Sequence, residues 1–294
     1  LNYDKKKAGL PQSLCEKADD IYTNSKTKIN ALSKLFFPFP DILKGQSDMV
    51  RLAVVLKSFE RTHDFYKSKI ISDDVFYDTI KDVAVWCENN QNNGLKNYRW
   101  LHNHASGKLF KIGRLQFQMY KAPMGSDYTK LPFKRGDNLL YIHIPQGEKL
   151  TRESCTDSVR RAEEFFRSHF PNYEYDYFFC ESWLLFPGNR SFMAKDSNIV
   201  KFMDLFTPAY STENDSQAIE RIFGERKSDI NDYCEDTSLQ KSAKEYMLGG
   251  NKLGFGTGYI KRQEAAKIHL AFCSAAPKAN IIIKKEHPKG QLPQ

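Results

Sequence analysis

The spacing of apolar residues divides the chain into a helical first part and a later part that contains strands. Between Ser13 and Asn90, apolar residues recur at steps of three and four, which is the period of amphipathic helices. The run Phe37-Pro38-Phe39-Pro40 interrupts this pattern, because proline lacks an amide donor and restricts the residue before it. We therefore predict a helical bundle, in which Ser72-Asp73-Asp74 starts a helix that continues through Trp86.

The period changes after Trp100. Residues Leu109 to Tyr120 alternate apolar and polar side chains, as strands do, and a second strand, Asn138 to Ile144, follows a turn at Arg135-Gly136-Asp137. A polar, glycine-containing connector spans Asn89 to Asn97. We place a domain boundary beside it, with a helical domain at residues 1–100 and a second domain at 101–294.

The segment from Leu139 to Phe186 reads as a βαβ unit. The strand is followed by a polar turn, a helix that begins near Ser154 and is amphipathic from Ser158 to Phe170, and a second aromatic strand, Tyr175 to Phe186. Gly249 to Gly258 does not match GxGxxG, and we expect a loop or a tight passage from a helix to a strand. Beyond the unit we predict helices at 198–206, 216–223 and 239–247 and a strand at Ile281-Ile282-Ile283.

Composition excludes several classes of protein. A length of 294 residues with 40% hydrophobic residues allows about two domains with their own cores. We see no apolar run near the ~18 residues that span a bilayer, and none typical of a secretory signal at the first residues, so we expect a cytoplasmic protein without membrane segments. The six cysteines are scattered without a CxxC pair, which favours reduced thiols over a zinc site.

The net charge of +8 favours an anionic partner: nucleic acid, a phosphorylated cofactor or a membrane face. No basic stripe is interleaved with aromatic residues, so nucleic acid ranks last among our hypotheses.

The turn from Pro145 to Ser154 joins a strand to a helix, where free amides and the helix dipole can hold a pyrophosphate. The dipole contributes only about 0.3–1 kcal/mol, so such a site also needs cations, for which the sequence offers Lys149, Arg152, Arg160 or Arg161. The alternative is an ordinary βα connection, in which Ser154 or Thr156 caps the helix.

Four side chains on the two strands are candidates for catalysis: His143, Cys180, Glu181 and Ser182. A neutral His143 could accept a proton from an amine, Glu181 could act as a general base, and Cys180 or Ser182 could be a nucleophile or proton donor. The alternative for His143 is a buried, hydrogen-bonded histidine without a role in catalysis. His102-Asn103-His104 has metal-ligand spacing but no third ligand nearby, so we expect a solvated turn and no metal.

Several motifs, taken in order, resemble one family of bacterial acyltransferase-domain proteins. In that family a helical N-acyltransferase N-terminal domain precedes a GNAT-like C-terminal domain. The resemblance covers most of the chain and is strongest from Leu109 to Phe206. The matching residues are Phe110 to Phe117, His143-Ile144-Pro145 with Gly147 and Leu150, Ser158 and Ala162, Cys180 to Leu185, and Asp196 to Ile199.

This resemblance implies an α+β fold, with a helical N-terminal domain followed by a mixed β-sheet flanked by helices. It implies that the strand carrying Leu140, Tyr141 and Ile142 pairs with the pantetheine arm of acetyl-CoA or another acyl-CoA, while the next strand splays away to admit the acyl group. The following turn would hold the pyrophosphate, through Gly147, Lys149, Thr151, Arg152 and Ser154. The turn departs from the usual Arg/Gln-x-x-Gly-x-Gly/Ala pattern because it holds a single glycine.

The leading hypothesis is therefore an acyl-CoA-dependent N-acyltransferase, in which an unidentified amine attacks the thioester directly. Backbone amides beside Leu140 to Ile142 would polarise the thioester carbonyl. A GNAT-shaped module that binds a ligand or partner without chemistry is the second hypothesis, and a nucleic-acid-binding protein is the third.

Overall fold

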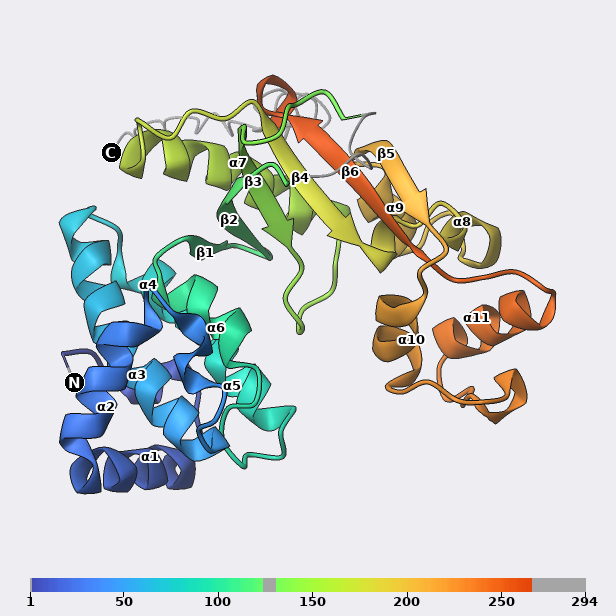
Figure 1. Cartoon of the computed structure of the whole chain (residues 1–294). Coiled ribbons are helices and arrows are strands. Elements are labelled where there is room, and N and C mark those ends of the chain that lie inside the picture. The colour runs from blue at the N-terminus through green and yellow to red at the C-terminus, as the bar shows by residue number, and fades with distance from the viewer. Residues whose placement is uncertain (1, 124–130, 266–294) are drawn as a thin grey trace, which may run out of the picture.

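The computed structural model describes residues 2–123 and 131–265, and the first part of the chain is helical (Figure 1). Long α3 runs through the middle of this part and contacts α1, α2 and α6. The elements are η1 (Lys5–Ala8), α1 (Gln12–Asn24), α2 (Lys26–Phe36), η2 (Pro40–Leu43), α3 (Asp48–Ser68), α4 (Asp73–Ile80), α5 (Asp82–Glu88) and α6 (Tyr98–Ala105).

The helical bundle agrees with the apolar period, and α2 ends at Phe36, directly before the proline-containing run. The prediction of one helix from Ser72 through Trp86 is wrong. Lys81 separates α4 from α5, and the Ala84 amide bonds to the Lys81 carbonyl three residues back, which tightens the turn. The break gives α5 a direction of its own and leaves Asp82, its first residue, buried.

The second part of the chain is built on a six-stranded sheet with the order β1-β2-β3-β4-β6-β5. Every neighbouring pair is antiparallel except β3 and β4, which are parallel. This is the mixed sheet that the resemblance implies. The strands are β1 (Leu109–Ile112), β2 (Leu115–Lys121), β3 (Asn138–His143), β4 (Tyr177–Ser182), β5 (Thr207–Thr212) and β6 (Phe255–Lys261).

The single strand predicted from Leu109 to Tyr120 is a hairpin of β1 and β2. The chain reverses at Gly113-Arg114, where Gly113 has φ +66°. A Cβ at Gly113 would lie 2.7 Å from the Ser158 Oγ of α7, so the turn needs glycine for both its dihedral and its close packing. Phe110 and Ile112 pair with Phe117 and Leu115 and share one buried face, so the alternation shifts by one residue at the turn.

The parallel pair is joined by α7 (Arg152–His169), which forms the predicted βαβ unit. Thr151, and neither Ser154 nor Thr156, is the residue before this helix, and its side chain accepts from the Ser154 amide. The second strand is shorter than predicted. It ends at Ser182, whose hydroxyl accepts from the Leu184 amide and starts the turn η4 (Trp183–Leu185).

The remaining elements build the far end of the sheet, and β6 inserts between β4 and β5. The helices predicted at 198–206, 216–223 and 239–247 are present, and the glycine-rich stretch passes from α11 into β6. Strand β5 was not predicted, and the strand expected at Ile281–Ile283 lies outside the described residues. The helices between β4 and β6 are α8 (Asn189–Phe192), α9 (Asn198–Met203), α10 (Ser216–Phe223), η5 (Ile230–Asp232) and α11 (Ser238–Leu248).

A single large core joins the helical part to the sheet. Tyr66 of α3 packs its ring against Phe110 of β1 at 5.3 Å between centroids, and the Lys111 amide donates to the Thr79 hydroxyl of α4. The helices therefore hold a fixed position against the sheet edge.

Across residues 2–123 and 131–265, no helix combines the length and apolar character needed to cross a membrane.

Candidate active site

The site begins where β3 and β4 part. Only Leu140↔Phe178 and Tyr141↔Phe179 are paired, although each strand has six residues. Beyond these pairs the strands diverge toward their carboxyl ends, as Figure 1 shows. A cavity of about 730 Å³ lies there. Ile142 and His143 of β3 and Ile144 directly after it line one side, and Glu181 and Ser182 of β4 line the other. Carboxyl ends of parallel strands are where ligand sites in open sheets usually form.

His143 is the central side chain of the cavity wall. Its Nε2 lies 2.8 Å from Gln118 Oε1, its ring stacks on Tyr141 at 4.4 Å between centroids, and the edge of Trp100 meets it at 4.9 Å. Burial, and next the charge of nearby His104, lowers the pKa of the His143 imidazole to about 3. The ring is therefore neutral at pH 7, with a proton on one nitrogen and a lone pair on the other.

Glu181 faces His143's strand across the opening. The Tyr141 hydroxyl lies 3.3 Å from Glu181 Oε2 and 3.4 Å from the Glu181 carbonyl oxygen. Burial, and then the neighbouring Glu181 charge, raises the pKa of Tyr141 well above its ordinary value, so the phenol stays protonated and acts as a donor. The carboxylate of Glu181 is thus held at the wall of the cavity.

The other two candidates have different positions. Ser182 lines the cavity, but its hydroxyl is engaged with the Leu184 amide. Cys180 is fully buried and does not line this cavity. Neighbouring residues of a strand point to opposite faces, so Cys180 faces the core while Glu181 faces the cavity. Burial also raises the pKa of the Cys180 thiol, so it remains uncharged. The structure does not bring Cys180 to the reaction space.

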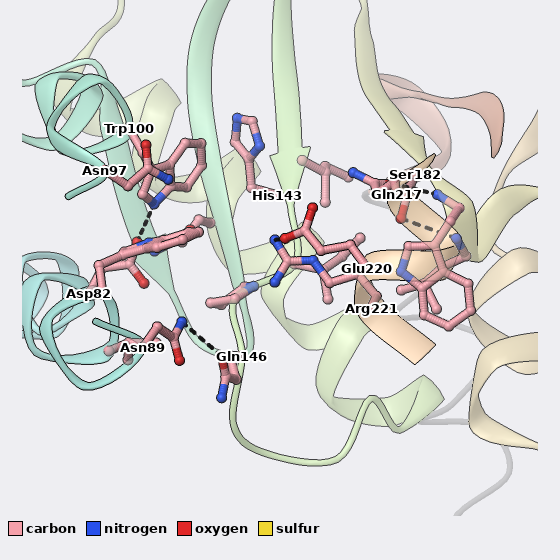
Figure 2. A pocket seen from close by; sticks show the side chains of 18 of the residues that line it. Asp82, Asn89, Asn97, Trp100, His143, Gln146, Ser182, Gln217, Glu220 and Arg221 are labelled. Atoms are coloured by element: carbon pink, nitrogen blue, oxygen red, sulfur yellow. Dashed lines mark hydrogen bonds and ion pairs between the residues drawn. The ribbon is translucent and has the colours of Figure 1, made fainter. Parts of the chain in front are cut away.

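The helical part of the chain supplies one side of the cavity, which sequence reasoning missed. Asp82 and Trp100 lie there, and the Trp100 indole donates to the Asp82 carboxylate (Figure 2). His104 Nε2 lies 3.2 Å from Asp82 Oδ2. Burial raises the pKa of Asp82, yet the bonds from His104 and Trp100 outweigh burial and leave that pKa lowered.

The expectation that His102-Asn103-His104 is a solvated turn is therefore wrong. These residues form the last turns of α6, and His104 is fully buried. A helix places residues three or four apart on one face, so Trp100 and His104 both point toward the sheet. The four-residue spacing of Trp100 and His104 could have indicated that they share one face of a helix. Their partner Asp82 could not be predicted in this way, because it is distant along the chain.

The opposite side of the cavity comes from α10. Gln217, Glu220 and Arg221 lie there, across from Asp82 and Trp100 (Figure 2). The Gln217 amide oxygen accepts from the Trp183 amide at 2.7 Å, which ties α10 to the end of β4. The three tryptophans of the chain, Trp86, Trp100 and Trp183, all line this cavity.

The turn after β3 leads from the cavity to the start of α7. Gly147 has φ +124°, and a Cβ there would meet nothing within 4 Å, so the turn is open. Lys149 is exposed and Arg152 partly exposed, and neither forms an ion pair with a described residue. Arg160 and Arg161, by contrast, pair with Asp157 on α7 itself, so they are engaged elsewhere.

Arg114, which the sequence did not single out as a site residue, lies beneath this turn. It is 7% exposed, donates from Nη1 to the Pro145 carbonyl at 2.9 Å, and its Nε has no described hydrogen-bond partner. No described carboxylate pairs with it, and burial lowers the pKa of its guanidinium. The turn thus combines a helix N-terminus with positive charge from Lys149, Arg152 and Arg114, which suits a phosphate group.

Among the described residues, no group of three or more His, Cys, Asp or Glu side chains could hold a metal.

Comparisons with solved structures identify the fold. An acyltransferase in complex with decanoyl-CoA and teicoplanin superposes with a TM-score of 0.73 at 20% identity, over 87% of this chain and 86% of that chain. An acyltransferase mutant in complex with octanoyl-CoA gives a TM-score of 0.73 at 19% identity, over 87% of this chain and 86% of that chain. No curated protein matches the sequence.

Two family models cover nearly all of the described chain. The N-acyltransferase N-terminal domain matches residues 7–107 and the GNAT-like C-terminal domain matches residues 109–260. Both are the domains that the sequence motifs resemble, so the predicted family is confirmed. The chain belongs to the acyltransferase family in which an N-acyltransferase N-terminal domain is joined to a GNAT-like C-terminal domain.

Proposed function

We propose that this protein transfers the acyl group of an acyl-CoA to an amine, inside the cavity between β3 and β4. The observation that carries the proposal is the divergence of the two strands after Tyr141 and Phe179, beside a cavity of about 730 Å³. Pairing of β3 with β4 ends at Tyr141, so the backbone of Ile142 is available on that edge. The pantetheine arm would pair with this edge as an added strand does.

The phosphates of the coenzyme would lie on the turn after β3. Lys149, Arg152 and the amides at the start of α7 supply positive potential there, next to the Thr151 cap. The thioester then lies near His143 and Glu181, because the pantetheine arm leads from the turn back along β3. Two residues predicted from the sequence differ from the rest in this placement. Leu140 is fully buried and would act only through its backbone, and Cys180 is buried in the core and takes no part.

The reaction is a direct attack. The amine nitrogen bonds to the thioester carbon, the carbon–sulfur bond breaks, and the thiolate of CoA leaves. The nitrogen loses one proton to the neutral His143 ring, and the imidazolium passes that proton to the departing thiolate, which leaves as the thiol and restores neutral His143. Backbone amides of β3 would polarise the carbonyl oxygen as negative charge develops.

The acyl chain and the acceptor are chosen by the size of the cavity. The superposed acyltransferases hold decanoyl-CoA or octanoyl-CoA, and one of them also holds teicoplanin. We propose that this chain likewise favours an acyl group of intermediate length over acetyl. A large acceptor would enter between α5 and α10, where Trp86 and Glu220 face the opening.

The test is an acyl-transfer assay with acetyl-, octanoyl- and decanoyl-CoA against a panel of amines, with free CoA as the readout. Wild-type protein should release CoA only when an amine is present. His143→Ala should lower kcat by about 10²–10⁴-fold, the range for loss of a general base. His169→Ala is the matched control, because His169 lies at the end of α7 and bonds the Lys69 carbonyl. Binding of acyl-CoA without transfer to any amine would instead favour a ligand-binding module.

A further inference from the structure

Gln118 connects His143 to the helical part of the chain. Gln118 lies on β2 opposite Tyr141, two pairs along from His143, so its side chain is on the same face as His143. Its Oε1 is 2.8 Å from His143 Nε2. An amide oxygen only accepts hydrogen bonds, so the nitrogen that faces it must carry the proton.

Asn103 lies at the amino end of the Gln118 amide. Gln118 Nε2 donates to Asn103 Oδ1 at 3.2 Å. With the amino end engaged on α6, the oxygen end is left for His143. The order is therefore Asn103 Oδ1, then the Gln118 amide, then the His143 Nε2 proton, and His143 Nδ1 keeps its lone pair.

The contacts of the His143 ring restrict its rotation. Tyr141 stacks on one face at an interplanar angle of 20°, and the Trp100 indole meets the ring at 76°. Rotating the ring to exchange its nitrogens would break the Gln118 bond and place a ring carbon against an amide oxygen. The two ring contacts and the amide thus hold one orientation and one tautomer together.

We propose that Gln118 is a positioning residue, which fixes His143 with Nε2 protonated and Nδ1 free to take the proton of the attacking amine, and that Asn103 of α6 sets the orientation of Gln118. The proposal rests on the proposed function, because it assumes that His143 is the base. It gives α6, the last helix before the sheet, a part in the chemistry, since Asn103 belongs to α6. Neither Gln118 nor Asn103 can exchange protons with the ring at neutral pH, so they act only through orientation.

The experiment reads the tautomer directly. Nitrogen-15 NMR of His143, assigned by comparison with His143→Ala, should show a protonated Nε2 and an unprotonated Nδ1 in the wild-type protein. Gln118→Met removes the amide at similar volume and should give a mixture of tautomers. Asn103→Asp keeps an oxygen toward Gln118 Nε2 and should retain the wild-type tautomer. Lys121→Met, an exposed site at the end of β2, controls for methionine on this strand.

Kinetics provide the second readout. Gln118→Met should lower kcat about tenfold and leave the KM for acyl-CoA unchanged, and Asn103→Asp should keep kcat within about twofold of wild type. A wild-type spectrum with the proton on Nδ1, or an unchanged tautomer in folded Gln118→Met, would overturn the proposal. If the tautomer behaves as expected but His143→Ala retains full transfer activity, the hydrogen-bond order stands and the assignment of His143 as base falls.

Discussion

The Tyr141 hydroxyl reaches the Glu181 carboxylate across the line where β3 and β4 separate, with 3.3 Å between Tyr141 Oη and Glu181 Oε2. Tyr141 is also the last residue of β3 that pairs with β4. The same residue therefore closes the paired part of the strands with its backbone and spans the start of the opening with its side chain. The hydroxyl bond restrains Glu181 at the cavity wall.

Replacing Tyr141 with Phe should release Glu181 without disturbing the stack on His143. We expect kcat to fall about threefold to tenfold, because one neutral-to-charged hydrogen bond stabilises by about 1–2 kcal/mol and only part of that is lost. Steady-state assays with saturating acyl-CoA measure this change. Tyr177→Phe, at the opposite end of β4 from Glu181 and Ser182, is the control and should have wild-type kcat. A Tyr141→Phe enzyme as active as wild type would show that the bond to Glu181 does not serve the reaction.

His143 should make the protein less stable in mild acid. Its pKa is about 3 in the folded protein against an ordinary value of 6.5, so the unfolded chain binds a proton in this range and the folded chain does not. The stability from this group is complete above pH 6.5 and is lost as pH falls from 6.5 toward 3. Between pH 7 and pH 4.5, wild type should lose about 2 kcal/mol more than His143→Gln, as measured by urea unfolding. Parallel pH curves for both proteins would contradict the lowered pKa.

The turn after β3 should discriminate CoA from pantetheine. Lys149→Ala with Arg152→Ala should weaken CoA binding about tenfold, because two unpaired cations near the phosphates are removed, and the loss should shrink in high salt. Pantetheine lacks those phosphates, so its affinity should not change. Isothermal calorimetry measures both. Arg160→Ala removes a cation from the same helix that is already paired with Asp157 and Glu164, and it should bind CoA like wild type. Equal losses for both ligands would place the phosphates elsewhere.

Asp82 should be important for stability as well as for the cavity wall. Asp82→Ala leaves His104 and the Trp100 indole without their partner in a buried position, and we expect a loss of about 3 kcal/mol in the free energy of unfolding. Asp82→Asn keeps an oxygen for Trp100 and should cost less. Chemical denaturation measures both values. The control is Asp78→Ala, which breaks an exposed pair with Lys81 and should change stability by less than about 1 kcal/mol. Similar values for Asp82→Ala and Asp78→Ala would mean that the buried pair is not stabilising.

Sequence patterns predicted the helices and strands that are determined by interactions between residues close together along the chain. The helix from Arg152 ends where Pro171 follows, and α10 matches its predicted bounds, because apolar period and helix breakers act over one or two turns. The prediction failed at Gly113-Arg114, where the alternation shifts by only one residue, and at Lys81, where a helix breaks without proline or glycine. Strand β5 was missed for a related reason, since four of its six residues are exposed and it lacks a buried face.

The sequence by itself determined the class of fold, the order of its elements, the family, and the strands and turn that bear the candidate site. Those depend on contacts between near neighbours and on motifs that lie close together along the chain. Only the tertiary structure brought Asp82 against His104 and Trp100 against His143, joined Asn103 to Gln118, and turned Cys180 into the core while Glu181 faces the cavity. The reason is that a packed core and a diverging pair of strands juxtapose residues far apart in sequence, and no local period records which distant side chains will meet.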